Sequence, residues 1–288
     1  MDYVGQIIRP PSEAHSLILQ VTVGCSHNKC TFCGAYKDKR FSIKESEIVS
    51  QDLDFAARYC REQHKVFLVD GDALIIPFPR LLALFQQIRE TLPWVRRISL
   101  YGSARSIRGK TADQLTQLKA LGLDRVYLGL ESGSDDVLQR IQKGESAESM
   151  IAAARRVNAA GLFLSITVLL GLAETTGSRE HALRTAEVLN RMAPRQIAAL
   201  TLMPLDNTSL GRLYRDGQFK LPDSSAILTE LRLLVEHIET PSQFHANHAS
   251  NYLPIMGRLP RDKEQILALI DQAQSGTRQL VPEGLRRL

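Results

Sequence analysis

Six short runs rich in β-branched and other apolar residues alternate along this chain with longer stretches of helical period. The runs cover residues 17–23, 65–70, 97–101, 125–130, 162–170 and 197–203, and the helical patterns lie near residues 44–62, 78–92, 111–121, 134–160 and 178–193. Strands that alternate with helices pair in parallel, with the helices packed outside the sheet. The pattern therefore predicts the α/β fold class, as a partial (β/α)6 TIM-like barrel.

The chain divides on this basis into an N-terminal segment (1–16), a barrel core (17–205) and a small, mainly helical C-terminal extension (206–288). Amphipathic patterns near residues 224–238 and 263–273 predict the helices of the extension. They flank a polar loop, 244–252, whose candidate substrate-binding or acid-base residues are His245, His248, Asn251 and Tyr252. A capped, hydrogen-bonded loop would explain the same composition. Tyr101 and Arg105 are further candidates, from the third strand and the loop after it.

Length and composition exclude several classes of protein. With 288 residues, 44% of them hydrophobic, the chain can bury a core large enough for one barrel or two modest domains. No apolar stretch is long enough to span a membrane, and residues 1–11 lack the apolar core of a secretory signal, so we expect a cytoplasmic protein without a membrane partner. The net charge of +5 comes from dispersed basic residues, which favours a small-molecule substrate over nucleic acid.

Three of the four cysteines, Cys25, Cys30 and Cys33, lie close together just after the first predicted strand. This clustering favours metal binding in a reducing compartment over a disulfide framework. Three thiolates from one loop can hold three irons of a [4Fe-4S] cluster and leave the fourth iron open to another ligand. A zinc site completed by His27, or three incidental cysteines, would also fit. The spacing alone does not decide between zinc and iron-sulfur.

Small and polar residues follow several of the predicted strands, at the sheet edge where ligands bind in folds of this kind. The turn Asp-Gly-Asp-Ala-Leu (70–74) follows the second run, and its glycine lets the backbone approach a ligand closely. Glu131 stands at the end of the fourth run, and the segment Leu-Leu-Gly-Leu-Ala-Glu (169–174) ends the fifth. Each is also explained as an ordinary turn between a strand and a helix.

Taken together, these features resemble the radical S-adenosylmethionine superfamily, whose core domain is shared by coproporphyrinogen dehydrogenases, tRNA methylthiotransferases and nitrogenase-cofactor enzymes. The resemblance covers about residues 15–205. It rests on the cysteine loop with Phe32 just before Cys33, on Asp-Gly-Asp-Ala (70–73) in place of the family's Gly-Gly-Glu, on Leu-Gly-Leu-Glu-Ser-Gly-Ser-Asp (128–135) and on Gly-Leu-Ala-Glu (171–174). One departure is the spacing of the first two cysteines, which have four residues between them where the family's common loop has three. His27 lies in that longer spacer.

The resemblance implies a role for each matching residue. Cys25, Cys30 and Cys33 would bind three irons of a [4Fe-4S] cluster, and the methionine moiety of S-adenosylmethionine would bind the fourth. The residues expected at S-adenosylmethionine are Phe32 and Leu170 beside the adenine, Gly71, Asp72 and Ala73 at the methionine ammonium, Lys143 at the methionine carboxylate, and Glu131 or Ser132 at the ribose hydroxyls.

The activity that the resemblance implies is reductive cleavage of S-adenosylmethionine to a 5′-deoxyadenosyl radical, which abstracts hydrogen from an unidentified substrate. A flavodoxin-like or ferredoxin-like protein is the expected electron donor. The chain has no second cysteine cluster, which disfavours subclasses with an auxiliary iron-sulfur centre. A tRNA-modifying enzyme is one alternative, and a non-catalytic metal-binding or chaperone protein that keeps the barrel is another.

Overall fold

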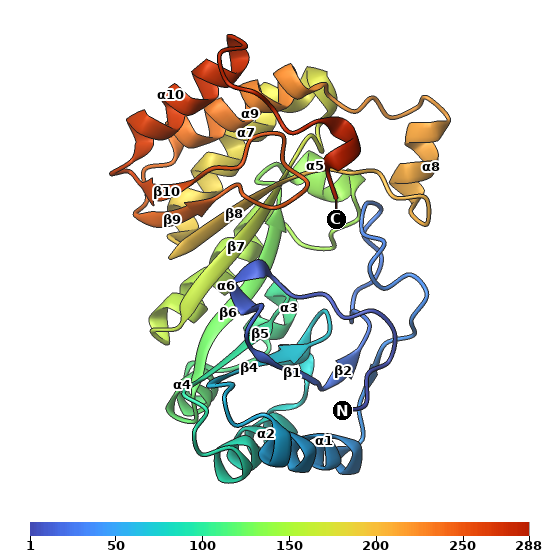
Figure 1. Ribbon diagram of the computed structural model, residues 1–288, viewed down its shortest axis with the longest axis vertical. Coiled ribbons are helices and arrows are strands. Elements are labelled where there is room, and N and C mark those ends of the chain that lie inside the picture. Colours follow the sequence, from blue (N-terminus) through green and yellow to red (C-terminus); the bar gives the residue numbers. More distant parts are fainter. Residues whose placement is uncertain (288) are drawn as a thin grey trace. The chain divides into compact units, whose positions relative to one another are not determined.

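The computed structural model describes residues 1–287 and contains an eight-stranded sheet and a two-stranded sheet (Figure 1). The strands are β1 Leu17–Gln20, β2 Thr22–Val23, β3 Ser42–Ile43, β4 Lys65–Val69, β5 Arg97–Tyr101, β6 Leu123–Glu131, β7 Phe163–Leu170, β8 Gln196–Thr201, β9 Ser242–His245 and β10 Met256–Leu259. The larger sheet has the order β1-β4-β5-β6-β7-β8-β9-β10, and β2 pairs with β3. Its strands run parallel from β1 to β6 and from β7 to β9, whereas β10 is antiparallel to β9. The predicted α/β class is confirmed, and the open, mostly parallel sheet agrees with the predicted partial barrel.

Helices follow the strands in the predicted alternation. The α-helices are α1 Ser46–Tyr59, α2 Phe78–Thr91, α3 Ala104–Arg108, α4 Ala112–Ala120, α5 Asp135–Arg140, α6 Ala147–Ala159, α7 Glu174–Met192, α8 Ser209–Arg215, α9 Ser224–His237 and α10 Lys263–Gln274, and the 3-10 helices are η1 Pro11–Glu13, η2 Ala73–Ile75 and η3 Glu283–Leu285. The helical pattern near 134–160 forms two helices, because Gln142 and Gly144 adopt left-handed backbone conformations between α5 and α6.

The chain forms two compact units. The first unit consists of Met1–Asn28, Ala35–Leu128 and Arg155–Leu164, and the second unit of Lys29–Gly34, Gly129–Ala154 and Ser165–Leu288. The strands β6 and β7 and the helix α6 each contribute residues to both units. The cysteine loop is also divided, because Cys25 belongs to the first unit and Cys30 and Cys33 belong to the second.

The first unit is built on β1, β4, β5 and the first part of β6. Phe67 and Val69 of β4 pack with Ile18 of β1 and Tyr127 of β6 in a buried cluster. Helix α1 packs against β1 and α2, and α2 packs against α4 (Figure 1). The amphipathic period of α1 explains this arrangement, since the buried face of the helix carries Leu53 and other apolar residues.

A buried carboxylate anchors the N-terminal segment within the first unit. Glu13, at the end of η1, is completely buried. It accepts hydrogen bonds from the Arg97 guanidinium at 2.9 Å, the Tyr127 hydroxyl at 2.7 Å and the Ser16 hydroxyl at 2.5 Å. These donors replace the water that a carboxylate loses on burial. The N-terminal segment is therefore bound to β5 and β6 rather than being a loose extension.

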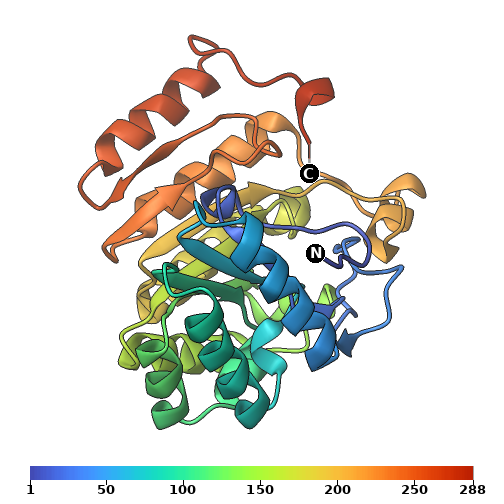
Figure 2. The same ribbon diagram turned by 60° about the horizontal axis from the view of Figure 1, so that its bottom comes forward.

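The second unit carries three long helices beside the later strands. Helix α7 packs against α9, and α9 packs against α10. Figures 1 and 2 both show α9 and α10 side by side. The predicted helices of the C-terminal extension are confirmed by the positions of α9 and α10. No helix of the described chain combines the length and apolar character needed to cross a membrane.

The C-terminal extension differs from the prediction at its polar segment. Phe244 and His245 lie in β9, not in a loop, and β9 pairs with β8 and β10. The physical reason is that Phe244 is completely buried between its strand partners Ile197 and Gly257. Burial alternates along this short strand, which is typical of a half-buried strand with one face toward a core. The extension therefore adds two strands to the main sheet.

Candidate active site

The cysteine loop follows β2 and contains Cys25, Cys30 and Cys33, each partly exposed. None of the cysteines in the described chain forms a disulfide bond. Among residues 1–287, no three His, Cys, Asp or Glu side chains are arranged to hold a single metal ion. The loop up to Asn28 belongs to the first unit, and residues Lys29–Gly34 belong to the second.

In the first unit, the turn after β4 packs directly on the backbone that carries Cys25. The Gly71 N–H donates a hydrogen bond to the Gly24 carbonyl over 3.1 Å. A Cβ atom on Gly71 would lie 3.0 Å from Cβ of Cys25 and 2.8 Å from a ring carbon of Tyr36. Only glycine fits at this position, because a larger residue would collide with the cysteine or the tyrosine. Ala73 follows in η2 and is completely buried.

The Asp72 carboxylate is completely buried and ties the cysteine loop to α3. It accepts hydrogen bonds from the Ser26 hydroxyl at 2.7 Å, and from the Ser103 N–H at 3.2 Å and hydroxyl at 2.8 Å. Ser26 is the residue after Cys25, and Ser103 is the N-cap of α3. The side chain of Asp72 is therefore already occupied by three donors from the protein.

Asp70 opens the predicted turn but was not among the candidate site residues. It is completely buried, and its Oδ2 atom accepts hydrogen bonds from Gln20 Nε2 and the Gly24 N–H, each at 3.0 Å. The same oxygen lies 3.6 Å from Nζ of Lys39. A charged residue directly after an apolar strand was the available signal, but its partners come from distant parts of the chain.

Tyr101 and Arg105 lie on different elements of the first unit. Tyr101, in β5, makes edge-on ring contacts with Phe67 and Tyr127 at centroid distances of 5.0 and 5.9 Å. Burial, with a smaller contribution from Tyr127, raises the pKa of Tyr101, and burial raises the pKa of Tyr127 to about 12. Both phenols therefore stay neutral at neutral pH. Arg105 is exposed on α3, the helix that Asp72 holds through its N-cap.

In the second unit, backbone hydrogen bonds hold the part of the loop that carries Cys30 and Cys33. The Thr31 N–H donates to the Ile141 carbonyl, and the Thr31 carbonyl accepts from the Leu210 N–H, both at 2.9 Å. The Asn207 side chain donates to the Gly34 carbonyl at 2.9 Å. These bonds attach the loop to the C-terminal end of α5 and to α8 and the loop before it.

The aromatic ring before Cys33 packs on an apolar cluster of the same unit. Phe32 contacts a group of buried residues that includes Leu169, Leu172 and Leu202, from the ends of β7 and β8. Leu170 is also buried, but it is not part of this group. Of the three leucines in the motif at the end of β7, Leu169 and Leu172 are therefore the ones that share an apolar surface with Phe32.

Glu131 and Lys143 form an ion pair in the second unit. Nζ of Lys143 lies 3.0 Å from Oε1 of Glu131, and the two side chains are 17% and 12% exposed. Glu131 has φ +65°, a conformation that costs energy in a residue with a side chain. A Cβ atom on Gly129 would collide with the Glu131 carboxylate. Ser132 is buried, and its hydroxyl accepts a hydrogen bond from the Ser134 N–H at 3.0 Å.

A second buried carboxylate that the sequence analysis missed holds the turn after β7. Glu230, on α9, accepts hydrogen bonds from the Gly171 N–H at 3.0 Å and the Ser178 hydroxyl at 2.5 Å. It also lies 2.8 Å from Nδ1 of His181. The signal for it was a charged residue on the apolar face of a helix, three positions after Ile227 and four before Leu234.

The four candidates from the C-terminal extension have different surroundings. His245 hydrogen-bonds Gln196 at 3.3 Å, and His248 contacts the Ser250 hydroxyl at 2.9 Å. Burial lowers the pKa of His248. The buried Asn251 accepts from the Thr201 hydroxyl and donates to the Ala199 carbonyl, so it joins its loop to β8.

Tyr252, the last of these candidates, is fastened to the C-terminal segment. Its hydroxyl donates to Glu283 at 2.6 Å, and its ring lies 4.0 Å from the Arg286 guanidinium. Burial raises the pKa of Tyr252 to about 12, and the hydrogen bond to Glu283 adds to the shift. Arg286 is buried and donates to the Ser250 carbonyl at 2.7 Å, so this basic residue is not part of the solvent-exposed surface.

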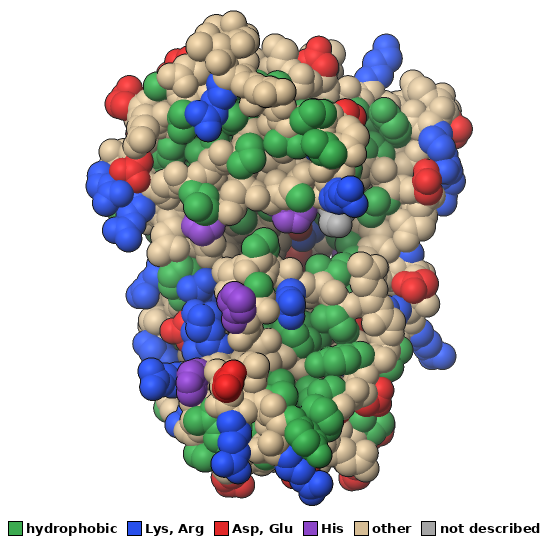
Figure 3. All heavy atoms as spheres, in the orientation of Figure 1, with side chains coloured by type: hydrophobic (Ala, Val, Ile, Leu, Met, Phe, Trp, Pro, Cys, Tyr) green, Lys and Arg blue, Asp and Glu red, His purple; other side chains and the backbone are tan. Residues whose placement is uncertain are grey.

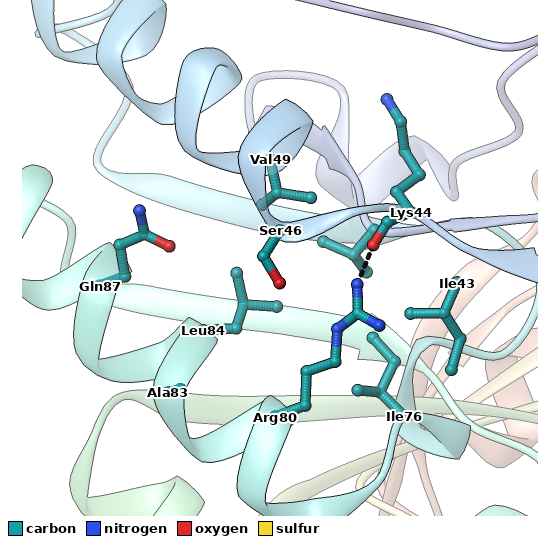
Figure 4. A pocket seen from close by; sticks show the side chains of 10 residues that line it. Ile43, Lys44, Ser46, Val49, Ile76, Arg80, Ala83, Leu84 and Gln87 are labelled. Atoms are coloured by element: carbon teal, nitrogen blue, oxygen red, sulfur yellow. Dashed lines mark hydrogen bonds between the residues drawn. The ribbon is translucent and has the colours of Figure 1, made fainter.

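A cavity of about 120 Å³ lies apart from these residues, beside α1 and α2 of the first unit (Figure 4). Its walls are mainly apolar, and Val49, Ile76 and Leu84 contribute to them. The Arg80 guanidinium reaches across it to donate to the Lys44 carbonyl. None of the predicted site residues lines this cavity.

Comparison with known proteins identifies the chain's relatives. A profile described as the Radical SAM superfamily matches residues 19–186, more than half of the chain. The chain is 26% identical over 188 residues to 4′-phospho-dehydrooxetanocin synthase from Priestia megaterium, a match that covers 59% of this chain and 25% of that protein. Its fold is similar to coproporphyrinogen III oxidase from Escherichia coli, with a TM-score of 0.58, 17% identity and coverage of 78% and 52% of the two chains. It is also similar to methylornithine synthase, with a TM-score of 0.55, 14% identity and coverage of 93% and 83%.

The chain spans about a quarter of the length of the curated relative it matches and about half of the coproporphyrinogen oxidase. The solved structures have low sequence identity and establish the fold, whereas the profile match establishes the family. The region that the profile matches includes Cys25, Cys30 and Cys33, the turn after β4 and the ion pair of Glu131 and Lys143. This protein belongs to the radical S-adenosylmethionine superfamily.

Proposed function

We propose that this enzyme uses one [4Fe-4S] cluster, bound by Cys25, Cys30 and Cys33, to cleave S-adenosylmethionine reductively and abstract hydrogen from a small-molecule substrate. The observation that carries the proposal is the three-cysteine loop at the start of the region that matches the family. The cofactors of the family are a [4Fe-4S] cluster and S-adenosylmethionine. When bound, they supply a 5′-deoxyadenosyl radical, and the protein supplies binding, orientation and exclusion of water.

The residues of the loop fit the cluster by their chemistry. Thiolates are the ligands that iron-sulfur clusters require, and three come from one partly exposed loop without a disulfide bond. Gly71 has no side chain and so leaves room beside Cys25, whereas any larger residue would crowd this cysteine. These features support cluster binding by the chain as it is folded.

The turn after β4 would receive the methionine ammonium through its backbone. The Asp72 carboxylate already accepts three hydrogen bonds and is completely buried, so it offers little to a ligand. Backbone carbonyl oxygens around Gly71 can serve the same purpose, because an ammonium group donates to any accessible oxygen. The proposed ammonium site is therefore the backbone at Gly71, which is partly exposed, whereas Ala73 is as completely buried as Asp72.

The ion pair in the second unit would bind two other parts of S-adenosylmethionine. The Lys143 ammonium would pair with the methionine carboxylate, and the Glu131 carboxylate would accept hydrogen bonds from the ribose hydroxyls. Their separation of 3.0 Å keeps both side chains oriented before the ligand arrives. Phe32 and Leu169 offer an apolar surface for the adenine, with Leu172 beside them.

The substrate is proposed to be a small molecule and the electron donor a flavodoxin-like or ferredoxin-like protein. On the face shown in Figure 3, Lys and Arg side chains are interspersed with Asp and Glu side chains. A nucleic-acid partner would be expected to face a more continuous basic surface. His245 and His248 remain the proposed acid-base candidates for the substrate.

Anaerobic reconstitution with iron and sulfide, followed by dithionite reduction with S-adenosylmethionine, tests the proposal. We expect four irons per chain, and 5′-deoxyadenosine and methionine as products. Cys30→Ala should lose both the cluster and the products, because two loop thiolates remain. Cys60→Ala is the matched control, since Cys60 lies at the end of α1, outside the loop. A protein that binds zinc stoichiometrically and forms no 5′-deoxyadenosine would show that the proposed function is wrong.

A further inference from the structure

Two completely buried carboxylates, Asp70 and Asp72, stand on either side of Gly71. Each holds a residue next to Cys25, because Asp70 accepts from the Gly24 N–H and Asp72 accepts from the Ser26 hydroxyl. The Asp-Gly-Asp turn therefore contacts the backbone of the cysteine loop before and after the first cysteine. Any net charge on this turn acts close to Cys25.

The charge of Asp70 is offset by a buried lysine. Nζ of Lys39 lies 3.6 Å from Oδ2 of Asp70, and the Lys39 side chain is only 5% exposed. The same ammonium donates to the Gln6 carbonyl and lies 5.5 Å from the centre of the Tyr36 ring. The opposite charges of a buried carboxylate and a buried ammonium that lie close together largely offset each other in their effect on more distant groups. Asp70 thus serves mainly to hold the backbone at Gly24.

Asp72 has no such partner within the described chain. All three of its hydrogen bonds come from neutral groups, on Ser26 and Ser103. These donors take the place of the water that the carboxylate loses on burial, and none of them carries a positive charge. Lys110 lies near enough to interact electrostatically with Asp72. Burial lowers the pKa of Lys110, and the negative charge of Asp72 partly offsets this lowering. The Lys110 ammonium nevertheless donates to the Leu74 carbonyl instead of to Asp72.

We infer that Asp72 is a positioning residue for the cluster, which orients the Cys25 segment through Ser26 and keeps a negative charge without an ion-pair partner beside that segment. This inference rests on the proposed function. Reduction adds one electron to the cluster, so a nearby negative charge disfavours the reduced state and lowers the midpoint potential. A cluster of lower potential is the stronger reductant for the carbon-sulfur bond of S-adenosylmethionine. The positive charge of Lys39 favours the reduced state and therefore raises the midpoint potential, which limits the effect of the two carboxylates.

The charge hypothesis predicts shifts of opposite sign from two substitutions, one at Asp72 on the turn and one at Lys39, which faces the turn from the segment after the cysteine loop. Midpoint potentials are measured by redox titration of the reconstituted protein, without S-adenosylmethionine, followed by electron paramagnetic resonance. Asp72→Asn removes a negative charge with little change in shape and should move the potential in the positive direction. Lys39→Gln removes the positive charge and should move it in the negative direction. Asp113→Asn, in the exposed first turn of α4, is the matched control and should leave it unchanged.

Ser26→Ala separates the charge of Asp72 from its hydrogen bond. This variant keeps the carboxylate but loses the link to the loop, so we expect faster loss of iron on exposure to air, with a smaller change in potential than in Asp72→Asn. An unchanged or more negative potential in Asp72→Asn would overturn the inference. If Asp72→Asn takes up no cluster, an unchanged or more positive potential in Lys39→Gln overturns it. A wild-type protein without four irons would instead contradict the proposed function.

Discussion

Replacing Gly71 by alanine tests how closely the turn after β4 packs on the cysteine loop. The added Cβ atom would lie 2.8 Å from a ring carbon of Tyr36 and 3.0 Å from Cβ of Cys25. Such overpacking of a buried site costs about 1–3 kcal/mol in the free energy of unfolding. Because 1 kcal/mol shifts Tm by about 2–4 °C in chains of roughly this size, we expect Tm to fall by about 2–12 °C.

The assay combines thermal unfolding of the apo-protein, followed by circular dichroism, with the iron content after anaerobic reconstitution. The methyl group presses on Cys25, so we expect a lower iron content as well as a lower Tm. Gly284→Ala is the matched control, because an added Cβ atom there meets no atom within 4 Å. A Gly71→Ala protein with the Tm of Gly284→Ala and a full complement of iron would refute the argument from close packing.

Three further perturbations test other parts of the site. Lys143→Gln removes the cation that pairs with Glu131 and should weaken S-adenosylmethionine binding by about 10-fold or more in calorimetry; equal weakening by the exposed Lys65→Gln would argue against a local role. Glu230→Ala leaves its three buried donors without their acceptor and should lower the free energy of unfolding in urea by about 3–5 kcal/mol; a loss below about 1 kcal/mol would contradict this role. Burial raises the pKa of Glu283, but the hydrogen bonds it accepts outweigh this and lower it. The stabilisation from Glu283 is therefore present above its unfolded pKa and lost as pH falls through the lower folded value, so hydrogen exchange near residues 281–287 should rise at acidic pH in wild type and already at neutral pH in Glu283→Gln.

The hydrophobic periodicity of the chain predicted β1 and β4 to β8 of the main sheet and most helix positions, because burial on one face imposes a regular spacing on apolar residues. The cysteine spacing likewise indicated metal chemistry, since Cys25, Cys30 and Cys33 are neighbours in one loop. The two strands of the C-terminal extension were not predicted. The segment around Phe244 is short and polar on average, and its pairing with β8 and β10 makes it a strand.

The sequence by itself determined the fold class, the cysteine loop and the turns that follow the strands, since each depends on residues that are close together in the chain. The tertiary structure decided how the charged groups are paired. Lys39 meets Asp70, and Ser26 meets Asp72, across loops of the first unit, while Glu230 reaches the turn after β7 from a later helix. Folding selects these partners because a buried carboxylate must find donors or a cation wherever the packed chain brings them, and no local pattern in the sequence records which groups those will be.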